Sequence, residues 1–318
     1  MNFVFRRILI ALITLLLVSI LCFLIFSVIR GDPASYLSNT GASREQIETL
    51  RENMGLNRNV IARYFDWLIN FISGNPGNSF YFRGEAISSL ISVRLPVTIF
   101  LALLSILFII IISLTVSLLT VKKERSIIDN IINIFTAAGI STPGFFLGLL
   151  FIFIFGFGFK LFTPGDFIDF KDDFFGYLKN LCFPALAIAI PNSAMLIKFI
   201  RGSLFAELQS DYVRTARSKG ASWLYILRYH VLKNSILPAV TMFGMITAEV
   251  FSGSIIIEQV FTIPGIGRLL ITAISSRDYP LIQAIMVYIA FLVILANTLA
   301  DIVIMIIDPR IKQTRKIR

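Results

Sequence analysis

Histidine, cysteine and charge are all scarce in this 318-residue chain. Its one histidine and two cysteines leave no group of side chains with the spacing of a metal site. Charged residues make up 15% of the sequence, whereas soluble domains contain roughly 25%. So little polar surface cannot cover a soluble core, which excludes an ordinary soluble enzyme. The 56% of hydrophobic residues exclude a disordered protein.

The absence of two kinds of sequence motif reduces the number of possible functions. The sequence has no Gly-x-x-x-x-Gly-Lys-Ser/Thr phosphate loop, so the chain is not an ATP-binding subunit. No nucleophile paired with a base is recognisable, so no enzymatic activity and no cofactor are expected. Cys22 and Cys182 both lie in apolar runs, which argues against a disulfide framework. The hydrophobic runs fit a single polytopic helical bundle.

Long apolar runs predict an all-α membrane protein with six transmembrane helices. A crossing needs about 20 mostly apolar residues. The first span ends near residue 29, and the others cover 97–121, 131–159, 180–197, 235–257 and 280–307. A signal peptide would have a shorter apolar core and a small-residue cleavage site, so the first run is interpreted as an uncleaved span. The span 180–197 is short and contains two prolines, and we expect it to be kinked or packed inside the bundle.

The distribution of basic residues predicts the orientation. With the N-terminus in the cytoplasm, the inner segments (1–7, 122–130, 198–234 and 308–318) hold 17 Lys and Arg against five acids. The outer segments (30–96, 160–179 and 258–279) hold 12 residues of each sign. Positive charge favours the cytoplasmic side. Both termini, including the tail 308–318, are therefore predicted to be cytoplasmic.

The outer segment 30–96 is too long to be a simple connector. Ser43 and Gln46 form a capping-box pattern before helically spaced apolar residues, and 60–72 has the pattern of a second short helix. Two interpretations remain open for this small external segment. It is either a solvated loop containing two helices or a docking surface.

The inner segment 198–234 is long, basic and poor in helix breakers. Ala216 and Gly220 are four residues apart, which on a helix would leave one face nearly free of bulk, with Arg214, Arg217 and Lys219 around it. Such a face would permit close approach by a partner. An amphipathic helix lying on anionic lipid headgroups is the competing interpretation.

This segment resembles the EAA loop of binding-protein-dependent ABC importer permeases, which contains a short coupling helix. This chain has the alanine and glycine of the EAA loop at Ala216 and Gly220, and it has the later Leu-Pro pair at Leu237-Pro238. It departs from the loop at Arg214-Thr215, where the family has Glu-Ala. That departure, and the longer interval from Gly220 to Pro238, are features of the oligopeptide/dipeptide/nickel branch. Further segments resembling this branch are Gly31-Asp32-Pro33-Ala34, residues 50–56 and 63–68, Arg94-Leu95-Pro96-Val97-Thr98, residues 258–270, Arg277-Asp278-Tyr279-Pro280 and Asp308-Pro309-Arg310-Ile311.

The resemblance implies a bacterial inner-membrane permease of the type I ABC importer fold. It implies a second homologous permease, two cytoplasmic ATPases and an external substrate-binding protein as partners, and no nucleic acid. Residues 214–217, 219 and 220 would contact the ATPase. Peptides are the expected substrate, and nickel or another small solute such as an opine is the alternative within the branch.

Local chemistry predicts further features of the spans. Pro96 and Pro280 suit the first turn of a helix, where the missing amide has no partner. The turn 264–267 has glycines that allow backbone to approach backbone. Ser141-Thr142-Pro143-Gly144 should kink or unwind the third span. The break, with Ser141 and Pro143, would either line the translocation path or be filled by neighbouring helices.

Two acids at membrane depth offer another class of function. Glu249 and Asp301 interrupt the last two spans, where a carboxylate is costly unless it is paired or hydrated. Asp301 is expected to be structural, while Glu249 remains a candidate for the translocation path. A proton-coupled carrier would use both acids, but it leaves the long basic loop unexplained. A membrane enzyme is the most distant alternative. His230 is expected at a solvated or interface position rather than as a ligand.

Overall fold

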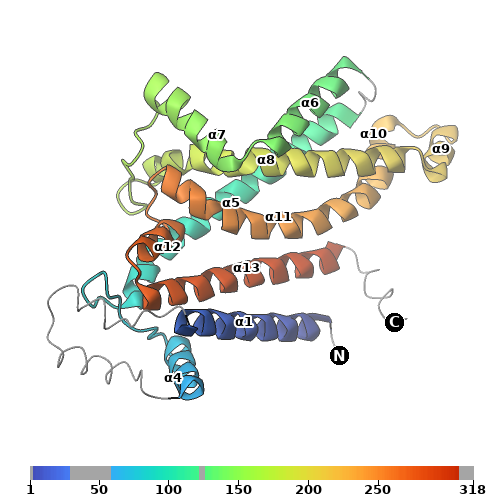
Figure 1. Ribbon diagram of the computed structural model, residues 1–318. Helices are drawn as coiled ribbons and strands as arrows, with labels where there is room; N and C mark the ends of the chain where they lie inside the picture. Colours follow the sequence, from blue (N-terminus) through green and yellow to red (C-terminus); the bar gives the residue numbers. More distant parts are fainter. Residues whose placement is uncertain (1–2, 29–58, 122–125, 308–318) are drawn as a thin grey trace, which may run out of the picture. The chain divides into compact units, whose positions relative to one another are not determined.

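The structure, a computed structural model, describes residues 3–28, 59–121 and 126–307. These residues are mostly helical (Figure 1). The elements in chain order are α1 (Phe3–Val28), α4 (Val60–Ile72), α5 (Ile87–Thr120), α6 (Ile127–Ser141), α7 (Gly144–Phe151), the π-helix η2 (Ile152–Gly158), α8 (Phe174–Leu208), α9 (Asp211–Ser218), α10 (Trp223–Tyr225), the π-helix η3 (Ile226–Val231), α11 (Leu232–Val260), α12 (Ile266–Ser275) and α13 (Tyr279–Ile307). The predicted capping box at Ser43 and Gln46 lies outside the described residues.

The described helices confirm the all-α membrane fold class. Five are long and apolar enough to cross a bilayer, namely α1, α5, α8, α11 and α13. A sixth span is present if α6 is counted together with the continuous helix that α7 and η2 form. The helix axis bends by 99° at the break between α6 and α7.

Several helices extend well beyond the predicted spans. Helix α5 begins ten residues before Val97, so the expectation that Pro96 opens this helix is wrong. Ile87, Leu90 and Ile91 are buried, and this apolar stripe continues the helix on the N-terminal side of the proline. Helix α8 has 35 residues and passes through Pro184 and Pro191 without ending.

The described residues divide into two compact units. Unit 1 contains the described parts of Met1–Ile8, Arg94–Leu269 and Leu292–Arg318, and unit 2 those of Leu9–Val93 and Leu270–Phe291.

Helix α8 lies at the centre of unit 1. Leu181, Ala185, Ala189 and Leu204 on this helix have no exposed surface. Helices α6 and α7 form a V whose apex rests on α8 (Figure 1). Glycines permit this contact, because a Cβ on Gly139 would lie 2.8 Å from the Cβ of Ala194. Small residues at the crossing therefore let the helices approach closely.

Unit 2 is held together by contacts among α1, α4, the loop before α5 and the start of α13. Asp278, which is buried, accepts hydrogen bonds from the Ser79 hydroxyl and from the Tyr81 amide. It thereby ties the loop before α5 to the loop before α13. Phe26 of α1 contacts the ring of Tyr279 at the start of α13.

Candidate functional site

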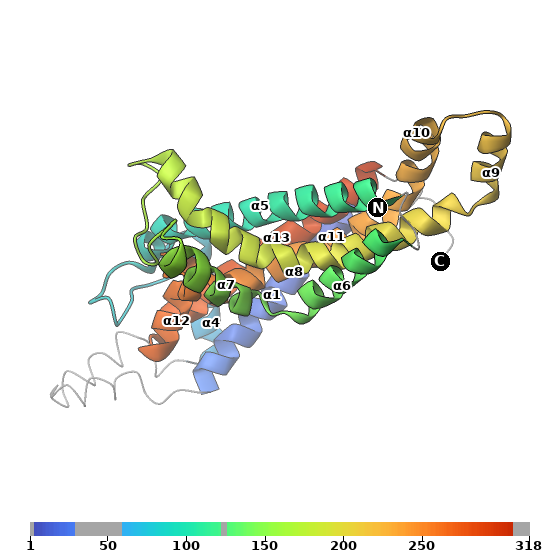
Figure 2. The same ribbon diagram turned by 90° about the horizontal axis from the view of Figure 1, so that it is seen from above.

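The segment between α8 and α11, residues 209–231, is called the connector here. It consists of α9, a tight turn, α10 and η3. Figures 1 and 2 both show α9 and α10 projecting past the ends of α8 and α11. The connector contains all six residues that the sequence predicted to contact an ATPase.

Helix α9 has an inner and an outer side. Val213 is fully buried, and Tyr212 and Ala216 pack against the core of unit 1. Arg214 and Thr215 are exposed, as are Arg217 and Lys219. The Thr215 hydroxyl donates to the carbonyl of Asp211 over 3.0 Å. The surface available to a partner is therefore cationic and hydroxylated.

The expectation that Ala216 and Gly220 share one face of a helix is wrong. Helix α9 ends at Ser218, and Gly220 lies beyond it with φ of +79°. The Gly220 amide donates to the carbonyl of Arg217, and the Ala221 amide donates to that of Ala216. This pair of bonds is a Schellman motif, whose left-handed position favours glycine because it lacks a Cβ. Gly220 therefore terminates the helix.

Tyr212 joins three elements and was not recognised from the sequence. Its hydroxyl donates to the Glu207 carboxylate at the end of α8 and accepts from the Asn234 amide over 3.3 Å. Burial raises the pKa of Tyr212, and the hydrogen bond to Glu207 acts in the same direction. The tyrosine thus fixes α9 to the end of α8 and the start of α11. Its position one residue after the start of a short helix gave no signal of this role.

Aromatic contacts hold the rest of the connector. The Arg217 guanidinium lies 5.4 Å from the centroid of the Trp223 ring. His230 is half-buried between the rings of Tyr212 and Tyr225, with centroid separations of 6.3 and 5.7 Å. Among the described residues no group of three metal-ligating side chains occurs. His230 is therefore part of the packing of the connector.

The expected break in the third span lies between Ser141, the last residue of α6, and Gly144, the first of α7. Thr142 and Pro143 form the link, and the Thr142 hydroxyl donates to the carbonyl of Ala138 over 2.7 Å. A Cβ on Gly144 would lie 3.1 Å from the carbonyl oxygen of Ala187 in α8. The break is packed against α8 on one side, while Ser141 and Pro143 are exposed on the other.

The two acids at membrane depth have different surroundings. Asp301 forms an ion pair with Arg7 of α1, with an N–O distance of 2.8 Å, which agrees with a structural role. Glu249 is exposed on α11, and no described residue forms a hydrogen bond or an ion pair with it. No hydrogen bond or ion pair within the described part of the chain joins Glu249 to Ser141 or Pro143.

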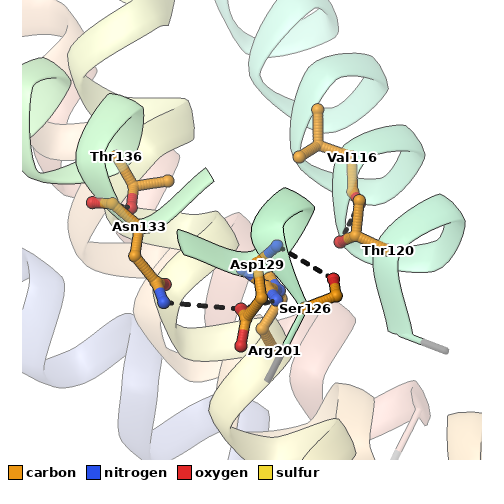
Figure 3. Close-up of polar contacts among 7 residues, drawn as sticks. All are labelled: Val116, Thr120, Ser126, Asp129, Asn133, Thr136 and Arg201. Carbon is orange, nitrogen blue, oxygen red and sulfur yellow. Dashed lines mark hydrogen bonds and ion pairs between the residues drawn. The ribbon is translucent and has the colours of Figure 1, made fainter. Parts of the chain in front are cut away.

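A buried ion pair between α6 and α8 was missed. Arg201 donates to Asp129, and the two residues are 5% and 9% exposed (Figure 3). Asn133 donates to the same carboxylate over 3.4 Å. Asp129, Asn133 and Arg201 line an open cavity of about 310 Å³. The other lining residues are Thr136, Ile197, Lys198, Gly202 and Phe205. Both charges lie outside the predicted spans, so they were counted only as loop residues.

A second buried acid, Glu258, organises the end of α11. Its carboxylate accepts from the Thr98 hydroxyl over 2.6 Å and from the amides of Gly267 and Arg268 over 2.7 and 3.2 Å. The Thr98 oxygen in turn accepts from the Ile266 amide. A carboxylate accepting from the first amides of α12 stabilises the start of that helix. The apolar pattern of the sequence gave no signal of this role, because two of the three donors are backbone amides.

The glycines of the turn 264–267 are required by this arrangement. A Cβ on Gly267 would lie 2.4 Å from the Cα of Ile255, so the backbones approach each other as expected. A Cβ on Gly265 would lie 2.2 Å from the carboxyl carbon of Glu258. Neither position can accept a larger residue without movement of its neighbours.

Family models match almost the whole chain. Residues 113–313 match the family described as binding-protein-dependent transport system inner membrane component, and residues 1–102 match the N-terminal region of such components. The chain belongs to this family. It is therefore a multi-pass membrane component of a binding-protein-dependent transport system.

Individual relatives are similar over their full lengths. The oligopeptide transport system permease protein AppB of Bacillus subtilis is 35% identical over 312 residues, which cover 98% of this chain and 99% of that protein. A Brucella abortus protein named as a permease of a peptide transport system is 34% identical over 309 residues, covering 97% and 98% of the two chains. A Sinorhizobium fredii protein named as a peptide ABC transporter permease is 32% identical over 310 residues, covering 98% and 99%.

Proposed function

We propose that the chain is the permease subunit of an ATP-driven importer of di- or oligopeptides. The observation that supports this most is the end-to-end similarity to proteins named for peptide and oligopeptide transport, including the connector. In such an importer the permease forms the path and catalyses no bond change. Its partners would be a second homologous permease, two cytoplasmic ATPases and an external substrate-binding protein.

The connector would transmit movement from the ATPases. Arg214, Thr215, Arg217 and Lys219 form the exposed side of α9 that would contact the ATPase. Ala216 lies on the inner side, where its small side chain lets α9 pack closely on the protein. The bonds of Tyr212 join α9 to α8 and α11. A displacement of α9 would therefore be passed to both helices as a rigid-body movement.

The path itself would involve the break in the third span and Glu249. A carboxylate at membrane depth needs water or a charged neighbour. Because no described residue pairs with Glu249, we place it against a hydrated cavity, together with the exposed residues Ser141 and Pro143. The charge distribution supports an orientation with both termini in the cytoplasm.

Uptake by vesicles tests the proposed function. Inverted vesicles are unsuitable, so right-side-out vesicles loaded with ATP would be given the external binding protein and a labelled tripeptide. We expect uptake that requires internal ATP and persists when a protonophore collapses the proton gradient. Uptake that needs the gradient and not ATP would contradict the proposal and favour a secondary carrier. ATP-dependent uptake of nickel without uptake of peptides would contradict the substrate.

Crosslinking tests the contact between the connector and the ATPase. A photoreactive benzoylphenylalanine at Thr215 is expected to crosslink to the ATPase subunit. The matched control is the same residue at Tyr229, which is exposed in η3 and outside the proposed contact. Equal crosslinking at both positions, or none at Thr215 in an importer that still transports, would contradict the assignment.

A further inference from the structure

Helix α4 has a row of large apolar side chains that no described residue covers. Ile61, Phe65, Ile69 and Ile72 are 64%, 55%, 64% and 76% exposed. They follow one another at intervals of four, four and three residues, so they lie on one side of the helix. Four large apolar side chains exposed to water would be unfavourable, because the free energy gained by burying each of them would be lost.

A second side of α4 packs on the membrane-spanning helices of unit 2. Tyr64 and Trp67 lie 5.4 and 5.9 Å from the ring of Phe23 in α1, and Phe71 lies 5.1 Å from Tyr288 in α13. The hydroxyls of Ser19 and Tyr64 are 2.8 Å apart. The ring contacts of α4 within its own unit are therefore made by Tyr64, Trp67 and Phe71, which lie on a different side of the helix from the exposed row.

The third side of α4 is polar. Asp66 and Asn70, four residues apart, are exposed on this side, whereas the guanidinium of Arg63 at its edge lies 5.9 Å from the centroid of the Phe23 ring in α1. At 100° per residue, the packed, apolar and polar sides each occupy about a third of the helix circumference. A helix with exposed apolar and polar sides suits the boundary between lipid and water.

The apolar row continues into a groove between α4 and α1. The groove has a volume of about 300 Å³ and is lined by Ile20, Phe23, Leu24, Val60, Ile61, Tyr64 and Phe65. Leu24 and its neighbours Leu21 and Ile25 are also exposed on α1. Helix α1 is long and apolar enough to cross a membrane, and exposed apolar residues on such a span suit contact with acyl chains. Because Ile61 and Phe65 of the row line the groove together with Leu24, the row on α4 adjoins these exposed residues of α1.

The depth of α4 along α1 also fits the lipid boundary. Helix α4 crosses α1 at a steep angle (Figure 1) and contacts it from Ser19 to Leu24. These residues precede the end of the apolar span at Ser27 by three to eight positions. At about 1.5 Å per residue, they lie about 5–12 Å inside the end of the span. Helices lying in the membrane surface are buried to about 5–10 Å.

We propose that α4 lies in the membrane surface and that phospholipid acyl chains cover its exposed apolar row and fill the groove against α1. The helix anchors the segment after α1 to the lipid, with Asp66 and Asn70 turned to water. This assignment rests on the membrane location of the family and does not depend on the transported substrate.

Spin labels at two adjacent residues test this placement. Cys22 and Cys182 are replaced by serine, the partner subunits are made free of reactive cysteine, and a nitroxide is attached at Ile69→Cys or at the control Asn70→Cys. The importer is reconstituted in nanodiscs of phosphatidylethanolamine and phosphatidylglycerol. Oxygen concentrates in acyl chains, whereas a water-soluble nickel chelate does not enter them. We expect the ratio of oxygen to nickel relaxation to be several-fold higher at 69 than at 70.

Two results would overturn the proposal. Nickel relaxation at 69 equal to that at 70 would mean that the row is solvated. Protection of 69 from both reagents would mean that a protein, such as the second permease or the external binding protein, covers it. If the label at 69 prevents copurification of the subunits, Phe65→Cys and Asp66→Cys provide a second pair with the same expectation.

Discussion

Glu249 and Glu258 lie nine residues apart on α11, but their surroundings are opposite. Glu258 is fully buried and accepts three hydrogen bonds, whereas Glu249 is exposed and has no described partner. The apolar pattern identified Glu249 because it interrupts a long run. It did not identify Glu258 as a site, because that residue lies where the run ends and two of its three partners are backbone amides after a turn. Hydrogen bonds to backbone leave no mark on residue identity.

The two acids provide a matched comparison of stability. Glu258→Ala removes the acceptor of three donors, and each donor left buried and unpaired costs about 1–3 kcal/mol. We expect a clearly lower midpoint of thermal unfolding, or loss of the protein from the membrane. Glu249→Ala should leave the midpoint unchanged, whatever its effect on uptake. Purified variants in detergent would be compared by thermal unfolding, and equal midpoints would contradict the role of Glu258.

The buried pair of Asp129 and Arg201 leads to a second prediction at this scale. Removing one partner of a buried ion pair costs about 3–5 kcal/mol, because the other charge stays buried and unpaired. Asp129→Asn and Arg201→Met should therefore each destabilise the protein strongly. The double variant should be less destabilised than the sum of the two. Thermal unfolding of the four proteins measures this coupling, and strict additivity would show that the pair does not act as a unit.

At the scale of elements, the sequence predicted the positions of helices wherever apolar residues form long runs. It did not predict the angles between helices, which depend on packing. Runs of apolar residues located the spans and Pro143 located the break in the third one. The angle of the break depends on how closely α6 and α7 approach α8, which is set by contacts such as Gly139 with Ala194. The end of α9 was missed because Gly220 was read as part of a helix face. A glycine just past a basic last turn is a common helix stop.

The crossing of α6 and α8 should be sensitive to one methyl group. A Cβ on Gly139 would lie 2.8 Å from Ala194, closer than two carbon atoms can approach, so Gly139→Ala must push the helices apart. Overpacking of this kind costs about 1–3 kcal/mol. Gly202→Ala on α8 is the control, because a Cβ there would meet no atom within 4 Å. It should be neutral or slightly stabilising in thermal unfolding. A Gly139→Ala variant as stable as the control would show that the contact can relax.

The turn after α9 should respond to conformation rather than size. A Cβ on Gly220 meets no atom within 4 Å, but its φ of +79° is unfavourable for most side chains. Gly220→Ala should cost about 1–2 kcal/mol and reduce binding-protein-stimulated ATP hydrolysis. Gly220→Asn, which tolerates this conformation better, should retain more activity. If alanine and asparagine have equal effects, the backbone conformation is not what matters at this turn.

At the scale of the whole molecule, the order of short motifs along the chain was decisive. Residues 258–270 and the connector resemble one branch of importer permeases, and the family matches bear this out over nearly the whole length. The division of α4 into a packed, an exposed apolar and a polar side could not be predicted from the order of motifs in the sequence. Its apolar residues fit a simple amphipathic helix, and only the contacts of Tyr64, Trp67 and Phe71 separate the packed side from the exposed one.

The orientation of the molecule in the membrane is predicted by charge and can be measured directly. The segments assigned to the cytoplasm hold 17 basic and five acidic residues, and those assigned to the outside hold 12 of each. Lys171, before α8, and Lys219, after α9, are both exposed and lie at opposite ends of α8. With Cys22 and Cys182 replaced by serine, a cysteine at 171 should react with an impermeant maleimide in intact spheroplasts. A cysteine at 219 should react only after the membrane is permeabilised. Labelling of 219 and protection of 171 would reverse the orientation, and the connector would then lie on the opposite side of the membrane from the proposed cytoplasmic ATPases.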